Sequence, residues 1–151
     1  MIKIICVGKL KEKYLTAACD EYLKRLSKYT NIEIIEIQDE KIDEENIALL
    51  KEKERIQKLL NPKEYLITLE IEGKDLTSLE LANKINQIQI ENSNIVFLIG
   101  GSHGIHQDIK NQANFNLSFS KLTFPHQLFR VLLLEQLYRS YKIINNEKYH
   151  K

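Results

Sequence analysis

The sequence contains no tryptophan, one methionine, two prolines and two cysteines in 151 residues. With only five glycines as well, it is too poor in proline and glycine for a fibrous chain or a long disordered linker. No apolar run approaches the ~20 residues of a membrane-spanning helix. The apolar stretch at residues 2–7 is also too short for the core of a signal peptide. We therefore expect a globular cytoplasmic protein with no membrane partner.

The cysteines and histidines do not indicate a metal or redox centre. Cys6 and Cys19 lack the spacing of metal ligands or of a redox pair, and each lies in an apolar pattern. Both are therefore expected to be small core residues that form no disulfide. The four histidines show no metal-ligand spacing, and no Ser/His/Asp or Cys/His/Asp grouping is discernible. We expect neither a bound metal nor a hydrolytic nucleophile.

The formal net charge of +1 is unevenly distributed along the chain. Residues 121–151 carry six Lys and Arg against two Glu, a net charge of +4. The first 120 residues carry 16 basic and 19 acidic side chains, a net charge of −3. A polyanionic partner would be drawn to the C-terminal end. An unevenly charged solvated surface is the alternative, and charge alone does not decide between the two.

Strand-like and helix-like apolar patterns alternate along the whole chain. Strands are predicted over residues 2–7, 31–37, 65–71, 95–99 and 115–120. Helices are predicted over 10–28, within the charged segment 38–64, from 77 to about 88, over 105–114 and over 125–144. Thr77 and Glu80 fit a capping box, and Pro125 suits a first helical position.

This alternation predicts one α/β domain over residues 1–151, with a mostly parallel sheet covered by helices on both faces. Ligands of such sheets bind beyond the carboxyl ends of the strands. Loops 100–104 and 120–125 both lie at such ends. We therefore treat these two loops as a single candidate site.

The last predicted helix is apolar on two sides. One arc contains Leu133, Leu134, Leu137, Tyr138, Tyr141 and Ile144, and the other contains Leu128, Phe129, Leu132 and Ile143. The sheet can cover only one of these arcs. Leaving the other in water would cost several kcal/mol, at about 1.5–3 kcal/mol for each large apolar side chain. A twofold dimer would cover it, and burial within one chain is the alternative.

His126 and Arg130 lie four residues apart on the first arc, near the start of this helix. Desolvation and the positive end of the helix dipole both disfavour an arginine there. Arg130 therefore either reaches the surface or faces a pocket that holds an anion or a carboxylate. His126 either turns to solvent or takes part in catalysis.

Three of the five glycines occur in the turn Gly100-Gly101-Ser102-His103-Gly104. No Gly-Lys-Ser/Thr follows, as in a Walker A loop, and the spacing is not Gly-x-Gly-x-x-Gly. Two adjacent glycines would allow a flat ligand to approach the backbone closely and would permit positive φ. A tight turn with a purely structural role is the alternative.

Three longer stretches point to a family. The stretches are FLIGGSHGI, LSFSKLTFPHQLFRVLLLEQLYRSYKI and the terminal YHK. All three resemble the SPOUT superfamily of methyltransferases. With the opening VGKLKEKY and the length, they are similar to the ribosomal RNA large subunit methyltransferase H family, and the likeness covers the whole chain. That family methylates N3 of pseudouridine 1915 in helix 69 of 23S ribosomal RNA. The resemblance implies a C-terminal deep trefoil knot, a homodimer that acts on the ribosome, and S-adenosylmethionine as cofactor.

The resemblance also implies roles for individual residues. Backbone groups of three loops would bind the cofactor: Leu69, Gly100, Phe119, Ser120, Lys121, Leu122, Thr123 and Phe124. The catalytic residues would be His150, Arg139 and Tyr149, with the tail of one subunit approaching the cofactor of the other. RNA would be bound by Arg130, Lys148, Lys151 and His126. The proton on N3 would pass to His150, to His126 or to solvent before N3 attacks the methyl group.

The tail departs from the family at one point. Relatives often carry a glycine shortly before Tyr-His-Lys, where this chain has Asn145-Asn146-Glu147. Asparagine tolerates left-handed backbone angles, so we expect the turn to survive. Without the resemblance, the tail would be expected to fray, as chain ends commonly do.

Two other functions fit the residues alone. One is a non-enzymatic ribosome-binding factor, which would use the basic tail and have no affinity for S-adenosylmethionine. The other is an unrelated mononucleotide enzyme of flavodoxin-like form, although the loops of this chain offer little to a phosphate.

Overall fold

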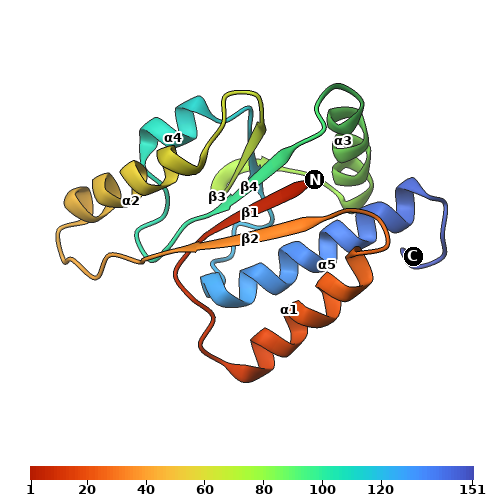
Figure 1. Ribbon diagram of the computed structural model, residues 1–151, viewed down its shortest axis with the longest axis horizontal. Coiled ribbons are helices and arrows are strands. Elements are labelled where there is room, and N and C mark those ends of the chain that lie inside the picture. The colour runs from red at the N-terminus through yellow and green to blue at the C-terminus, as the bar shows by residue number, and fades with distance from the viewer.

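Five parallel strands form a single sheet in the computed structural model, which describes residues 1–151 (Figure 1). The strands are β1 (Ile2–Val7), β2 (Ile32–Ile37), β3 (Tyr65–Asp75), β4 (Ile95–Ile99) and β5 (Phe115–Ser118), in the order β2-β1-β4-β3-β5. The helices are α1 (Lys13–Leu26), α2 (Glu45–Leu59), α3 (Ser78–Glu91), α4 (Gln107–Gln112) and α5 (His126–Ile144). The predicted α/β class is confirmed, and every pair of neighbouring strands is parallel.

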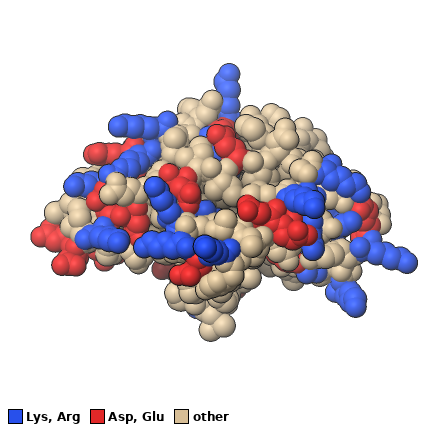
Figure 2. Space-filling view, turned by 60° about the horizontal axis from the view of Figure 1, so that its bottom comes forward, with Lys and Arg blue, Asp and Glu red and all other residues tan.

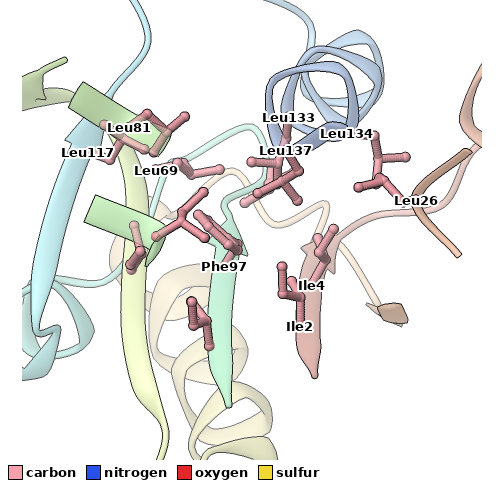
Figure 3. Packing of buried hydrophobic residues seen from close by; sticks show 14 of the residues in the cluster. Ile2, Ile4, Leu26, Leu69, Leu81, Phe97, Leu117, Leu133, Leu134 and Leu137 are labelled. Carbon is pink, nitrogen blue, oxygen red and sulfur yellow. The ribbon is translucent and has the colours of Figure 1, made fainter. Parts of the chain in front are cut away.

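Helices α1, α3 and α5 cover one face of the sheet and enclose the larger core (Figure 3). Strand residues such as Ile4 and Phe97 pack there against Leu133, Leu134 and Leu137 of α5. All five of these side chains are fully buried. The predicted first arc of the last helix is therefore its sheet-facing side.

Helices α2 and α4 cover the other face and enclose a smaller core. Ile56 of α2 and Ile109 of α4 pack there with residues of the sheet that include Val96 and Leu98. Strand β4 is buried along its whole length because both faces of the sheet are covered. The prediction of helices on both faces is thus confirmed.

Three large apolar residues of the first two helices are exposed and do not face the core. Tyr14 at the start of α1 is exposed, and so are Ile47 and Leu50 of α2. The buried stripe of α2 is instead Ala48, Glu52 and Ile56, spaced four residues apart. A buried glutamate interrupts this stripe, so its helical period was hard to recognise from hydrophobicity alone.

Strand β3 continues past Ile71, where it was predicted to end, to Asp75, and pairs with β5 through a shift in register between Leu69 and Lys74. A Cβ at Gly73 would lie 2.7 Å from the backbone of Leu117, so the two strands approach each other closely there. Strand β5 in turn ends two residues earlier than predicted. The Ser118 hydroxyl donates to the carbonyl of Ser120, and this polar turn ends the strand.

Element ends shift by a few residues elsewhere. Helix α1 begins at Lys13, three residues later than predicted, and Pro125 caps α5 from just outside its first turn. The capping box of α3 is present as expected, with Thr77 and Glu80 bonded reciprocally. None of the helices combines the length and the apolar character needed to cross a membrane.

Leu137 tests the contribution of the larger core. Leu137→Ala removes a fully buried side chain between α5 and the sheet, and we expect it to lower the free energy of unfolding by about 2–5 kcal/mol. Urea denaturation followed by circular dichroism measures the change. Ile90→Ala, at a position 78% exposed on α3, is the control and should stay within about 0.5 kcal/mol of the wild type. Equal effects of the two substitutions would contradict this account of the core.

Candidate functional site

A cavity of about 490 Å³ opens at the carboxyl end of β4. Its walls come from β3, from the glycine turn and from the loop before α5, with contributions from the starts of α2 and α5. The two loops that were treated as one site therefore line the same cavity. Of the eight predicted cofactor-binding residues, seven are among its lining residues: Leu69, Gly100, Phe119, Ser120, Leu122, Thr123 and Phe124. Lys121 is exposed and is not part of the lining.

The glycine turn is closed by its own backbone. Gly101 and Gly104 form an isolated antiparallel bridge, in which the Gly104 amide donates to the Gly101 carbonyl at 3.1 Å. A Cβ at Gly100 would lie 2.6 Å from the Gly104 carbonyl oxygen, and one at Gly101 would lie 2.8 Å from a methyl carbon of Val7. Gly100 is thus required by the packing of the turn itself, whereas Gly101 is limited by side chains of Val7 and Asp39 outside the turn. Positive φ occurs at Gly104 and not at the adjacent pair.

The loop before α5 forms an aromatic wall of the cavity. Phe119 packs on Phe129 with ring centroids 4.8 Å apart, and Phe124 lies 6.4 Å from the same ring. The Leu122 amide donates to the Ser120 hydroxyl, which holds the loop in shape. Together with the glycine turn, this loop offers apolar surface and free backbone groups to a flat, uncharged ring.

A group of charged side chains lies on another wall of the cavity. Glu70 and Glu72 follow Leu69 on β3, and the ammonium of Lys110 on α4 lies 3.3 Å and 3.5 Å from their respective carboxylates. Lys110 is the one lysine or arginine among the lining residues, which also include Glu45. The sequence analysis did not identify this group because nothing in the local pattern connects α4 with β3.

Arg130 is buried, with 3% of its surface exposed, and faces a carboxylate. It donates to Glu36 at 3.0 Å and to the Gly8 carbonyl at 3.2 Å. Of the two environments predicted for Arg130, the surface or a pocket with a negative group, the pocket is therefore correct, and the negative group is a carboxylate. A guanidinium enclosed in this way within its own chain is not available to RNA, and we withdraw Arg130 from the expected RNA contacts.

His126 occupies the first turn of α5 and is half-buried on the wall of the cavity. Nε2 of His126 lies close to Gly8: a Cβ added at Gly8 would be 3.1 Å from this nitrogen. Gly8 has a φ of 101°, which favours glycine at the junction between β1 and α1. His126 thus faces the cavity and not open solvent.

The C-terminal tail folds back on α5 through a turn at Asn146. Asn146 has a φ of 54°, a left-handed angle that asparagine tolerates, so the expected turn is present. The Glu147 amide donates to the Lys142 carbonyl and the Asn146 amide to the Ile143 carbonyl, which is the Schellman arrangement. The Glu147 carboxylate then accepts hydrogen bonds from Tyr29 and Lys142. The tail is therefore tied to its own helix instead of fraying.

The three predicted catalytic residues lie together at this end of α5. Glu135 accepts hydrogen bonds from Arg139 and, at 3.1 Å, from the Tyr149 hydroxyl. The guanidinium of Arg139 lies over the Tyr149 ring and 3.2 Å from Nδ1 of His150. Burial and the neighbouring Glu135 carboxylate raise the pKa of Tyr149 to about 12, so its hydroxyl stays protonated. Glu135 was not predicted as a site residue; its i,i+4 spacing from Arg139 is the sequence signal that could have revealed the ion pair.

Five of the seven tyrosines surround the tail. Tyr22, Tyr29, Tyr138, Tyr141 and Tyr149 form this tyrosine cluster, in which successive rings pack at centroid distances of 4.9–6.4 Å. Lysine and arginine side chains from α1 and α5 lie over several of these rings. Aromatic packing thus holds the tail in addition to the hydrogen bonds.

The cavity and the tail lie at opposite ends of α5. Phe129 lines the cavity, whereas the tail contacts Glu135 and Arg139. Because a helix rises 1.5 Å per residue, Arg139 lies about 15 Å further along α5 than Phe129. Within one chain, therefore, the predicted catalytic residues do not reach the predicted cofactor-binding residues.

The second apolar arc of α5 is only partly covered. Leu128 is 37% exposed, and Leu132 and Ile143 are half-buried. Phe129 has turned toward the cavity wall. A single chain thus leaves part of this arc open to a partner surface.

Basic side chains mark the end of the molecule where the tail lies. Figure 2 shows lysine and arginine side chains projecting there, at the right of the view, among a few acidic ones. Lys148 and Lys151 of the tail are exposed, whereas no Lys or Arg other than Lys110 lines the cavity.

Comparisons with known proteins agree with this arrangement. The family described as "Predicted SPOUT methyltransferase" matches residues 1–150. A protein of Methanococcus vannielii named "Putative ribosomal RNA large subunit methyltransferase H" is 57% identical over 99% of both chains. "Ribosomal RNA large subunit methyltransferase H" of Clostridium botulinum is 51% identical with the same coverage.

A solved structure shows the same fold at much lower identity. A probable methylase family protein from Haemophilus influenzae superposes with a TM-score of 0.59 over 99% of this chain and 70% of its own. Only 14% of the aligned residues are identical, so this likeness concerns the fold alone.

Gly100 tests the glycine turn. Gly100→Ala places a methyl group against the Gly104 carbonyl, so the turn must shift, and we expect unfolding to become easier by about 1–3 kcal/mol. Because the same turn lines the cavity, S-adenosylmethionine, the cofactor that the resemblance implies, should also bind more weakly, which calorimetry measures. Gly104→Ala is the matched control: no atom lies within 4 Å, and only its φ of 80° should cost about 1 kcal/mol. Intact stability and affinity in Gly100→Ala would disprove the account.

Proposed function

Because the chain belongs to the SPOUT methyltransferase family, we propose that it transfers a methyl group from S-adenosylmethionine to N3 of pseudouridine 1915 in helix 69 of 23S ribosomal RNA. The near-complete match to relatives named ribosomal RNA large subunit methyltransferase H is the observation that carries the proposal. Such a protein works on ribosomes, and therefore in the cytoplasm.

The cavity suits an adenosyl group in size and chemistry. About 490 Å³ lies within the range of sites for small cofactors, and its aromatic wall and glycine turn offer apolar surface with backbone donors and acceptors. We assign the adenosyl contacts to Leu69, Gly100 and the loop 119–124, in which the exposed Lys121 would contribute through its backbone. When bound, the cofactor supplies a methyl group on a sulfonium, which is already activated for transfer.

Two subunits are needed to complete the site. Since the tail lies far along α5 from the cavity of its own chain, the tail of one subunit would approach the cavity of the other. A homodimer built on the open arc of α5, with Leu128 and Leu132 at its contact, would also cover the apolar surface that one chain leaves in water. The trefoil knot of the family would hold the loop 119–124 and the start of α5 in place.

The chemistry of His150 follows from its neighbour. A guanidinium can only donate hydrogen bonds, so Nδ1 of His150 accepts from Arg139 and the proton of the neutral ring lies on Nε2. In this state His150 donates through Nε2 and cannot take a proton there. We therefore propose that His150 orients a carbonyl or phosphate of the RNA, and that the N3 proton leaves to solvent or to His126 on the cavity wall.

The remaining tail residues would hold the RNA. Lys148 and Lys151 are exposed and positively charged, which suits phosphates, and Tyr149 offers an aromatic face beside Arg139. Glu135 keeps Arg139 and Tyr149 in position. Alignment of the two reactants would account for most of the rate, because the methyl donor is already activated.

The alternative function is a ribosome-binding factor that uses the same basic tail without catalysis. The cavity at the glycine turn, with its aromatic wall, argues against it, since simple RNA binding requires no such site. A mononucleotide enzyme of flavodoxin-like form is excluded by the family to which the chain belongs.

A labelled methyl group tests the proposed activity. The protein is incubated with S-adenosylmethionine carrying a labelled methyl group and with ribosomes, free subunits or bare 23S RNA from cells that lack this modification. We expect label at one pseudouridine of helix 69, identified by mass spectrometry of RNA fragments. RNA binding without transfer and without affinity for S-adenosylmethionine would favour the non-enzymatic alternative.

His150 tests the chemistry of the tail. We expect His150→Ala to lower kcat by about 100-fold, because a positioned donor to the RNA is lost, while affinity for S-adenosylmethionine stays the same. His150→Gln keeps an N–H donor and should restore part of the rate, which a role as base would not allow. Single-turnover kinetics and calorimetry measure the two quantities. Unchanged turnover in His150→Ala would remove this residue from the mechanism.

A further inference from the structure

An adenine ring alone does not account for the charged wall of the cavity. Lys110 provides the one fixed positive charge among the lining residues, and Glu70 and Glu72 lie on either side of it. An uncharged adenine ring requires none of these side chains. Opposite charges side by side in a cavity wall are suited to a ligand that carries both signs.

The contact between Lys110 and Glu70 leaves hydrogen-bonding capacity unused. The Glu70 side chain is 11% exposed, and its Oε2 is buried without a hydrogen-bond partner. The Lys110 ammonium lies 3.3 Å from this oxygen but is not aligned for a hydrogen bond. A buried carboxylate oxygen in this state gains from a further donor.

The backbone of Lys110 is held firmly against the sheet. Its carbonyl accepts a hydrogen bond from Asn116 on β5, and the same Asn116 amide group donates to the Thr68 hydroxyl on β3. Glu70 lies one residue beyond Leu69 on the same β3 strand. The two charges are thus positioned directly beside the residues assigned to the adenosyl group.

We propose that Lys110 and Glu70 recognise the amino-acid end of the cofactor, with Lys110 binding its carboxylate and Glu70 binding its ammonium. The inference rests on the proposed function, since it takes S-adenosylmethionine as the ligand. In the free protein the two side chains face each other; in the complex each meets the opposite charge of the zwitterion. Glu72, whose side chain is 79% exposed, lies on the solvent side of Lys110 and makes the weaker contact.

The test compares three ligands that share the adenosyl group and differ beyond it. S-adenosylmethionine has the carboxylate, the ammonium and the sulfonium, decarboxylated S-adenosylmethionine lacks only the carboxylate, and 5′-methylthioadenosine is a neutral thioether without the amino-acid chain. Calorimetry gives the Kd of each. We expect Lys110→Met to weaken S-adenosylmethionine about tenfold and to spare the other two ligands. Glu70→Gln should weaken both ligands that carry the ammonium by a similar factor and leave 5′-methylthioadenosine unchanged.

Lys53→Met is the matched control. Lys53 of α2 forms an ion pair with Asp108, which lies on α4 together with Lys110. Lys53 does not line the cavity, so all three affinities should stay at the wild-type level. Unchanged binding of 5′-methylthioadenosine also shows that each variant is folded.

Two results would overturn the inference while leaving the proposed function intact. One is that Lys110→Met and Glu70→Gln bind all three ligands as the wild type does. The other is that they lose affinity for all three ligands equally, which would mean that the pair only shapes the cavity. If the wild type binds none of the three, the cofactor assignment itself fails and the inference falls with it.

Discussion

The packing of α5 on the sheet fixes the geometry on which every function of this protein depends. Leu133, Leu134 and Leu137 are fully buried against the strands, so the helix can neither slide nor rotate without opening the larger core. Its 19 residues span about 28 Å. The first turn lines the cavity and the last turns carry the tail, so burial in the middle of the helix keeps these two regions apart. The proposed division of one site between two subunits rests on this separation.

The sequence was informative about the fold where burial is continuous. Strand β4 is buried on both faces and therefore appears in the sequence as an unbroken apolar run. The capping box at the start of α3 was also recognisable from the sequence. The extension of β3 beyond Ile71 could not be predicted, because it depends on close contact with β5, which lies far along the chain. The stripe of α2 was missed for a related reason: Glu52 is buried there, and hydrophobicity does not predict buried carboxylates.

The site shows the same limit at the level of single contacts. The resemblance indicated the loops that line the cavity, and the charge of the tail was evident from composition. Contacts between residues far apart in the sequence could not be predicted. Arg130 contacts Glu36, 94 residues away, and Lys110 contacts Glu70 on another element. Local periodicity could show that Arg130 required a counter-charge, but only the fold shows which carboxylate supplies it and that this arginine is therefore unavailable to RNA.

The tyrosine cluster around the tail, in a chain without tryptophan, gives the molecule an optical property of its own. Five of the seven tyrosines lie in this cluster, in which the ring of Tyr138 lies 4.9 Å from that of Tyr149, and there is no indole to absorb the transferred energy. Release of the tail would change the quenching of these phenols. The native fluorescence of the protein thus reports on the position of its own C terminus, without a dye or an added fluorophore.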